Sequence, residues 1–269
     1  MESIQTCRSG TKRALPIMVP KNKTVVITGG TQGIGLEIVK KFLVNDNNVF
    51  VGSRSESKEF KEQCIGATFV KTDVKKIADI ENLMDIAVKP TGNIDVLINN
   101  AGISIWKKID NVNESFFYDI IDTNLKGVVF CCKYATKQMK NKGIIINIAS
   151  LAGKRGSKNN SIYVASKFAV VGVTQALAKE LGVYGIRVNS ICPVYIATPS
   201  LLANLSGDHP EVGDLEPSEF LKQWGKANSA LQRLPSGSEC ADACYYLASD
   251  SSSAITGQNI NVDCGVLPQ

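Results

Sequence analysis

The chain has 269 residues, 44% of them hydrophobic, which suits one large α/β domain with a continuous core better than two small domains. The net charge is +5, but basic and acidic residues are interleaved except for a small basic excess near the N-terminus, which favours a solvated surface over nucleic-acid binding. The longest apolar runs are broken before the roughly 18 residues that a membrane span needs.

The eight cysteines are dispersed without metal-type spacing. Several, such as Cys131 and Cys132, lie in apolar runs, where a free thiol behaves as a small hydrophobic side chain. We therefore expect a reducing, cytoplasmic location. The only histidine, His209, lies in a polar, turn-rich stretch, which excludes a histidine cluster for a metal and most hydrolase mechanisms.

Residues 1–22 lack hydrophobic periodicity and are predominantly basic, without the apolar core of a secretory signal. They predict a flexible tail or a subunit-packing arm, with a transit peptide as the alternative.

From residue 23 onward, short β-branched runs alternate with longer amphipathic stretches, as in a parallel sheet with crossover helices. The predicted strands are Val25–Thr28, Val49–Val51, Thr68–Thr72, Val96–Asn99, Ile144–Ile148, Arg187–Ile191 and Ile260–Val262. The predicted helices are Ile34–Asn45, Ile77–Val88, Phe116–Met139, Tyr163–Leu181 and Glu239–Ala248. Because the strands are almost entirely apolar, helices must cover both faces of the sheet. Residues 23–269 are thus expected to form a single α/β domain with a doubly wound parallel sheet, which binds ligands at the carboxyl ends of its strands.

Residues 200–237 interrupt this rhythm with several glycines and prolines around a predicted short helix, Phe220–Ala227. A long irregular segment near strand ends is often functional, so we expect a substrate lid, with an ordinary surface excursion as the alternative.

The first strand runs into a glycine-rich turn containing Gly29, Gly33 and Gly35, after which helical periodicity begins. Glycines allow close approach to a pyrophosphate, and the N-terminus of the following helix stabilises its charge. The spacing differs from the common G-x-G-x-x-G fingerprint, so the indication of a dinucleotide site comes from the order strand, turn, helix.

The end of the second strand indicates which dinucleotide binds. An acidic residue there would favour NAD, but the chain has Ser53, Arg54 and Ser55, which can bind the 2′-phosphate of NADP. NADP(H) is therefore favoured over NAD(H). The alternatives are that Arg54 is a solvated loop charge and that Glu56 complicates the local field.

Tyr163 and Lys167 are four residues apart on a predicted helix, so both side chains lie on one face. A cation near a tyrosine stabilises the phenolate and lowers its pKa from about 10. Ser150 ends the fifth strand and Asn124 lies on the preceding helix. Taken singly, Ser150 could cap a strand, Asn124 could mark a helix kink and Lys167 could be a surface charge.

Together these residues resemble the short-chain dehydrogenase/reductase family over residues 22–265. The family pattern T-G-x-x-x-G-x-G is met from Thr28 to Gly35, and Asp73, the turn 99–102 and the segment 124–127 follow in order. The resemblance implies a Rossmann-like fold with a seven-stranded sheet. It also implies hydride transfer between NADP(H) and a carbonyl or secondary alcohol.

The resemblance implies four catalytic residues. Tyr163 would exchange the proton, Lys167 would support it and bind the nicotinamide ribose, Ser150 would hold the substrate oxygen, and Asn124 would position a water beside Lys167. The implied cofactor contacts are Gly29, Thr31, Gln32, Gly33, Ile34, Ser53, Arg54, Asp73, Val74, Asn100, Ala101, Gly102, Tyr163, Lys167, Pro193, Ile196 and Thr198.

Two positions depart from the family pattern. Val194 replaces a glycine in the segment that wraps the nicotinamide, and because a β-branched residue avoids φ > 0, we expect an ordinary backbone there. Cys264 takes a glycine position near the C-terminus, where we expect it to affect packing and not chemistry.

The substrate walls expected from the sequence mix apolar and basic groups: Ser104, Ile105, Trp106, Leu151, Ala152, Lys154, Arg155, Tyr195, Leu201, Leu202, Phe220 and Trp224. They suit a ketone, a keto-sugar or a 3-oxoacyl group on a carrier. The alternatives are a catalytically silent redox sensor on the same fold and a sugar dehydratase or epimerase, although those relatives carry an extra domain. The resemblance also implies a homotetramer through the two long helices. From the residues themselves we expect no metal, no nucleic-acid partner and no membrane partner.

Overall fold

The computed structural model describes residues 21–140, 142–206 and 212–268. His209 and nearly all of the predicted tail, residues 1–20, lie outside the described residues.

Seven strands form one parallel sheet in the order β3-β2-β1-β4-β5-β6-β7. All seven predicted strands are confirmed, as β1 (Thr24–Thr28), β2 (Asn48–Ser53), β3 (Thr68–Lys71), β4 (Val96–Asn99), β5 (Gly143–Ile148), β6 (Ile186–Pro193) and β7 (Asn259–Val262). The chain order reverses between β1 and β4. The crevice outside the carboxyl ends of these strands is where a doubly wound sheet binds its ligand.

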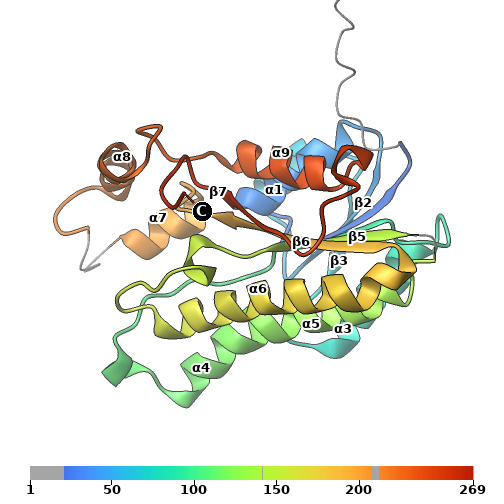
Figure 1. Cartoon of the computed structure of the whole chain (residues 1–269), viewed down its shortest axis with the longest axis horizontal. Coiled ribbons are helices and arrows are strands. Elements are labelled where there is room, and N and C mark those ends of the chain that lie inside the picture. Colours follow the sequence, from blue (N-terminus) through green and yellow to red (C-terminus); the bar gives the residue numbers. More distant parts are fainter. Residues whose placement is uncertain (1–20, 141, 207–211, 269) are drawn as a thin grey trace, which may run out of the picture.

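Helices cover both faces of the sheet (Figure 1). α1 (Gly33–Leu43) and α9 (Gly237–Leu247) pack on one face, and α3 (Ile77–Val88), α5 (Gly127–Thr136) and α6 (Ser161–Leu181) pack on the other. Side chains alternate between the two cores, since Val25 and Ile27 join the core under α1 and α9, whereas Val26 joins the core under α3, α5 and α6. The chain therefore forms the predicted single Rossmann-like domain.

The prediction of one continuous α-helix over Phe116–Met139 was wrong. The segment forms α4 (Glu114–Ile121), a π-helical turn (Asp122–Lys126) and α5, which ends at Thr136. Asn124 lies in the π-helical turn with its side chain fully buried against the loop after β4. Single π-helical turns commonly mark functional sites, and here tertiary hydrogen bonds offset the local irregularity.

The short helix α2 (Lys58–Gln63) was not predicted. Its signals are visible in retrospect: the Ser57 hydroxyl accepts a hydrogen bond from the Phe60 N–H at 3.0 Å, and Phe60 is the buried residue of the helix.

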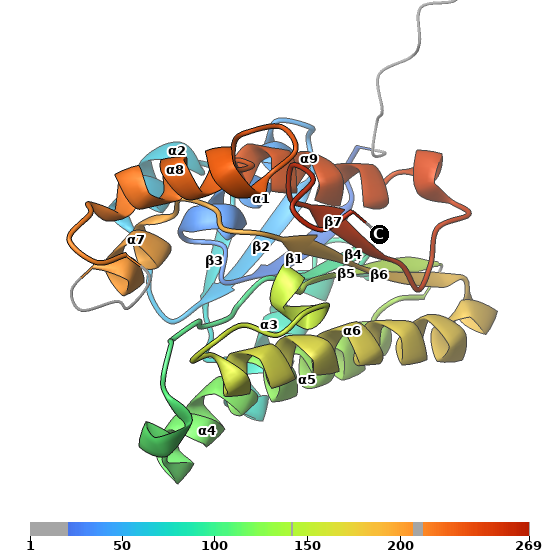
Figure 2. The same ribbon diagram turned by 60° about the vertical axis from the view of Figure 1, so that its left-hand side comes forward.

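The described part of residues 200–237 contains two helices at the end of the sheet where β6 ends (Figure 2). They are α7 (Pro199–Leu205), which was not predicted, and α8 (Pro217–Asn228), which confirms the predicted short helix. Leu205, Val212, Phe220 and Leu221 form a small core of their own, separate from the two cores of the sheet.

Among the described residues, the segment Ser161–Tyr184, which contains α6, is long and apolar enough by composition to cross a membrane. Helices packed in a core pass the same test, and α6 packs along β6.

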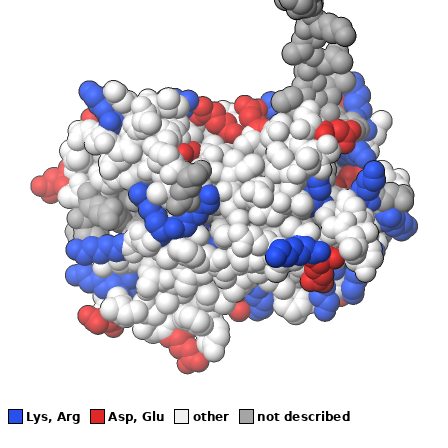
Figure 3. Space-filling model, in the orientation of Figure 1, with Lys and Arg blue, Asp and Glu red and all other residues white. Residues whose placement is uncertain are grey.

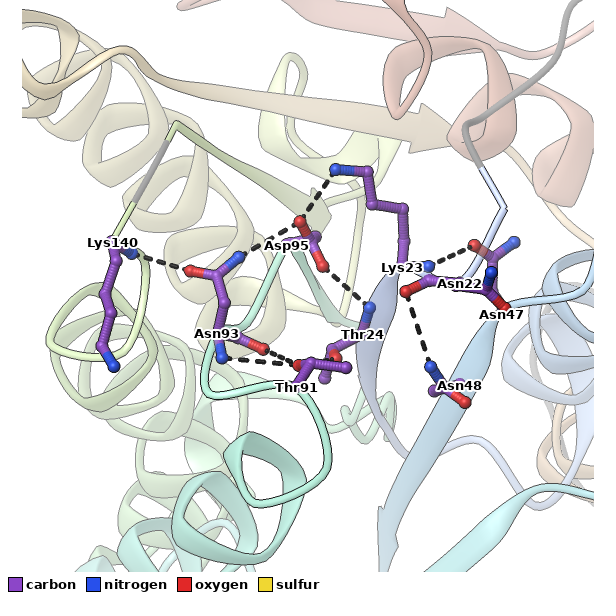
Figure 4. A network of polar contacts seen from close by, with 9 residues as sticks. All are labelled: Asn22, Lys23, Thr24, Asn47, Asn48, Thr91, Asn93, Asp95 and Lys140. Atoms are coloured by element: carbon purple, nitrogen blue, oxygen red, sulfur yellow. Dashed lines mark hydrogen bonds and ion pairs between the residues drawn. The ribbon is translucent and has the colours of Figure 1, made fainter.

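Asp95 ties together the amino ends of β1 and β4 (Figure 4). Its carboxylate accepts hydrogen bonds from the Thr24 N–H at 2.9 Å, the Lys23 ammonium at 2.9 Å and the Asn93 amide at 3.1 Å. This network lies at the amino ends of the two central strands, and the crevice lies at their carboxyl ends. It therefore holds β1 and β4 together without contacting the crevice.

We expect Asp95→Ala to lower the free energy of unfolding by about 2–3 kcal/mol, because the Thr24 N–H and the Asn93 amide lose a charged acceptor. Urea denaturation measures this. The control is Glu62→Ala, which removes an exposed ion pair to Lys58 and should cost less than about 0.5 kcal/mol. If both variants lowered the free energy of unfolding equally, the Asp95 network would stabilise the sheet no more than an exposed ion pair does.

Candidate functional site

A cleft of about 630 Å³ lies at the carboxyl ends of the central strands. Every residue expected to contact the dinucleotide lines this cleft. Of the four predicted catalytic residues, Ser150, Tyr163 and Lys167 line it and Asn124 lies behind its wall. The structure thus brings together residues from β1 through α7.

The turn after β1 is held against the end of β4 by Thr28 and Asn100. The Thr28 hydroxyl oxygen accepts hydrogen bonds from the Asn100 and Ala101 N–H groups, both at 3.1 Å. In return, the Asn100 amide donates to the carbonyl oxygens of Thr28 at 3.1 Å and Gly29 at 2.8 Å. These bonds fix the floor of the crevice.

Gly29 and Gly33 have φ angles of +67° and +56°, which side chains rarely adopt. A Cβ at Gly33 would lie 3.0 Å from the Thr198 methyl group, so the segment after β6 packs against the glycine turn. Thr198 caps α7 by accepting a hydrogen bond from the Leu201 N–H at 3.2 Å. Val194 is not among the described residues with positive φ, as expected for a β-branched residue.

The end of β2 forms the edge of the cleft. Arg54 is exposed there, and Ser53 accepts a hydrogen bond from the Thr31 hydroxyl at 3.3 Å. Glu56, which could have opposed an anion, pairs instead with Lys61 at 3.4 Å. The carboxylate is thereby partly neutralised, and Arg54 remains available to a phosphate.

Asp73 and Val74 line the cleft after β3. The Asp73 carboxylate accepts a hydrogen bond from the Lys75 N–H at 3.0 Å, which shapes this turn. Val74 packs against Gly127 at the start of α5, where a Cβ would lie 3.0 Å from the Val74 Cβ.

The Tyr163 side chain lies near Ser150 and, unexpectedly, near Ser104, and hydrogen bonding by these two side chains acts to lower its pKa. The sequence placed Ser104 only in the substrate wall. Burial raises the pKa of Tyr163, and the two serine hydrogen bonds act in the opposite direction. The pKa of Tyr163 is thus raised and not lowered as expected from Lys167, because desolvation of the phenolate outweighs the stabilising contacts.

Lys167 is 6% exposed and its ammonium donates a hydrogen bond to the Ile148 carbonyl oxygen at 2.8 Å. The ammonium lies 5.7 Å from the centre of the Tyr163 ring. Burial lowers the pKa of Lys167 to about 8. Lys167 is therefore mostly a cation at neutral pH, and its burial rules out the surface-charge alternative.

The Asn124 side chain is fully committed within the protein. Its amide donates to the Ile103 carbonyl oxygen at 2.9 Å and to the Ser166 hydroxyl at 3.1 Å, and its oxygen accepts from the Ile103 N–H at 2.8 Å. Asn124 thus holds the loop that carries Ser104. Ser150 likewise combines two roles, since its hydroxyl also caps the turn at Leu151 by accepting from the Ala152 N–H at 3.1 Å.

Most predicted substrate walls line the cleft, namely Ser104, Ile105, Trp106, Leu151, Ala152, Arg155, Tyr195, Leu201 and Trp224. The prediction was wrong for three residues. Lys154 turns away and donates to the Asn259 carbonyl oxygen at 2.6 Å, Phe220 belongs to the small core of α7 and α8, and Leu202 packs against that core.

The comparisons with known proteins agree with this geometry. A family model described as enoyl-(acyl carrier protein) reductase matches residues 29–267. The chain is 33% identical to the 3-oxoacyl-(acyl-carrier-protein) reductase of Staphylococcus epidermidis, over 91% of this chain and 99% of that protein. It is 35% identical to the xanthoxin dehydrogenase of Arabidopsis thaliana, over 96% of this chain and 94% of that protein.

Among solved structures, a variant of the actinorhodin polyketide ketoreductase with NADPH is similar with a TM-score of 0.84 and 32% identity, over 91% of this chain and 97% of that chain. The matching family model, the fold and the residues that line the cleft all indicate the same family. The chain belongs to the short-chain dehydrogenase/reductase family and is an NAD(P)-dependent oxidoreductase that acts on carbonyl or alcohol groups.

Proposed function

We propose that this enzyme transfers hydride between NADP(H) and a ketone or secondary alcohol, with Tyr163 as the proton-exchanging residue. The observation that carries the proposal is the half-buried Tyr163, whose side chain lies near Ser150 and Ser104 in the same cleft as Lys167. A catalytically silent redox sensor is the alternative, but a sensor has no need for this arrangement.

The cradle around the glycine turn fits a dinucleotide. A Cβ at Gly29 would lie 2.8 Å from the Ala101 Cα, and a Cβ at Gly35 would overlap the Gly29 carbonyl oxygen. Only glycine therefore keeps this turn close to the start of α1, whose N–H groups suit a pyrophosphate. Gly29, Thr31, Gln32, Gly33 and Ile34 would hold the phosphates.

The remaining contacts follow from position in the cleft. Asp73, Val74 and the segment Asn100–Gly102 would border the adenosine half, and Pro193, Ile196 and Thr198 would border the nicotinamide. When bound, the nicotinamide supplies or accepts the hydride.

At the reacting end, Ser150 would hold the substrate oxygen while Tyr163 gives or takes its proton. The Lys167 cation favours the phenolate form of Tyr163 by electrostatics and can bind the nicotinamide ribose. Because the Asn124 side chain is committed to Ile103 and Ser166, we assign Asn124 to positioning the loop of Ser104. A water held beside Lys167 would have to be bound by other groups of the π-helical turn.

Preference for NADP(H) rests on Arg54 and Ser53 at the end of β2. A guanidinium forms charge-assisted hydrogen bonds with a phosphate, and the pairing of Glu56 with Lys61 reduces the competing negative charge. The ketoreductase that resembles this chain was solved with NADPH, which supports the same preference.

We further propose that α7 and α8 form a substrate lid, that the enzyme is cytoplasmic and that it forms a homotetramer. The described cysteines are free thiols, which supports a reducing compartment.

On α6, the surface shown in Figure 3 is largely uncharged, and Phe168 is 44% exposed, as expected for a subunit contact. Val170, by contrast, belongs to the core. The mass of the enzyme by light scattering tests the tetramer.

We expect Gly35→Ala to weaken NADPH binding by about tenfold or more, because the new methyl group would displace the Gly29 carbonyl and the Asn100 amide. Quenching of intrinsic fluorescence measures the binding. Gly182→Ala, just after α6, where a Cβ meets open space, is the control and should bind NADPH normally. Normal binding by Gly35→Ala would remove the glycine turn from the cofactor site.

Arg54→Ala should reduce the ratio of NADPH to NADH affinity by about 10- to 100-fold, since the 2′-phosphate loses a charge-assisted hydrogen bond. Arg155→Ala, at the other end of the cleft, should leave the ratio unchanged. An unchanged ratio in Arg54→Ala would mean that Arg54 is only a solvated loop charge.

The proposed function itself is tested by following NADPH absorbance with diketones, keto-sugars and acetoacetyl thioesters. Turnover is expected with at least one class, and Tyr163→Phe should reduce it by about 10²- to 10⁴-fold while NADPH binding is retained. NADPH binding without turnover of any carbonyl would favour the sensor, and near-normal turnover by Tyr163→Phe would refute the tyrosine assignment.

A further inference from the structure

Three aromatic side chains from distant parts of the chain form one wall of the cleft beyond Tyr163. Trp106 follows β4, Tyr195 follows β6 and Trp224 lies on α8. The ring centres of Trp106 and Tyr195 are 6.4 Å apart, and those of Tyr195 and Trp224 are 4.9 Å apart in an edge-to-face arrangement. Such a wall offers flat apolar surface on which another ring can pack.

Negative charge is scarce at this end of the cleft. Of the described residues that line the cleft, the acidic ones are Asp73 and Asp119. Asp73 follows β3, and Asp119 pairs with Lys75 at 3.0 Å, so both lie beside the expected adenosine site. A keto-sugar would have to desolvate several hydroxyl groups against the aromatic wall, and each hydroxyl left without an acceptor would cost free energy.

One side-chain oxygen near the wall has no hydrogen-bond partner in the described part of the chain. Asn160, at the N-cap position of α6, lines the cleft three residues before Tyr163 and is 4% exposed. Its side chain caps no N–H group of the helix, and its Oδ1 has no hydrogen-bond partner among the described residues. The Lys107 N–H donates to the Asn159 carbonyl oxygen at 2.7 Å, which draws the loop of Trp106 against this corner.

A buried amide oxygen without a partner is destabilising, so such groups are rare unless a ligand completes them. We propose that the substrate is a ring-containing, largely apolar ketone or secondary alcohol whose ring packs on the Trp106–Tyr195–Trp224 wall and whose hydroxyl substituent donates a hydrogen bond to Asn160. This inference rests on the proposed function and specifies its substrate class. With the carbonyl at Tyr163 and the hydroxyl at Asn160, the ring has one orientation, so hydride reaches one face of the carbonyl.

The test compares tetralone with its hydroxylated positional isomers and their methyl ethers, using NADPH consumption by the full-length enzyme. At least one hydroxylated isomer should have a kcat/KM about tenfold or more above that of tetralone. Its methyl ether cannot donate a hydrogen bond and should lose this advantage. The ether comparison needs no variant and therefore does not depend on how substitutions fold.

Variants assign the effect to Asn160. Asn160→Leu should bring the hydroxyl-to-parent ratio of kcat/KM close to one, whereas Asn160→Asp, which keeps an acceptor of the same size, should retain the preference. The exposed neighbour Ser161→Ala is the matched control and should keep the ratio. A ratio that persists in Asn160→Leu would overturn the assignment.

The aromatic wall has its own readout. Trp224→Ala should raise KM for the ring ketone by about tenfold, whereas the control Leu231→Ala, at an exposed position outside the cleft, should leave this KM unchanged. Turnover of acetoacetyl thioesters or keto-sugars with none of any ring ketone would overturn this inference and leave the proposed function intact. NADPH binding with no turnover at all would instead refute the proposed function.

Discussion

The hydroxyl group of Thr28 holds the site together. It accepts two backbone N–H groups from the end of β4, while Asn100 bonds back to the carbonyl oxygens of the glycine turn. These bonds join the two central strands where the chain order reverses, so they set the width of the crevice. The Asp95 network joins the same two strands at their other ends. The two central strands beneath the site are therefore joined by side-chain hydrogen bonds at both of their ends.

At the proposed catalytic end of the cleft, burial acts against the charged forms of the titratable side chains. Burial raises the pKa of Tyr163 and lowers the pKa of Lys167 to about 8, so desolvation disfavours the charged form of each group. The same burial strengthens every electrostatic interaction inside the cleft. Ser104 and Ser150 offset part of the penalty at the tyrosine, and Asn124 keeps the loop of Ser104 in place.

Much of the fold was predictable because its signals are local. The strands are short apolar runs between turn residues, and each of the seven appeared where its pattern lies. The prediction of one continuous helix over Phe116–Met139 was wrong, because a π-helical turn forms where the buried Asn124 bonds to a loop distant in sequence. α2 was missed because six residues carry too little periodicity to stand out.

Residue type, spacing and order along the chain were enough to predict the sheet, the glycine turn, the family and most of the residues that line the cleft. Which side chains meet there depended on the three-dimensional packing. In the folded chain Lys154 points away from the cleft and Ser104 lies near the Tyr163 side chain. The Asn160 side-chain oxygen is buried near the aromatic wall. Such contacts join loops that are far apart in sequence, and their hydrogen bonds follow from packing that no local pattern records.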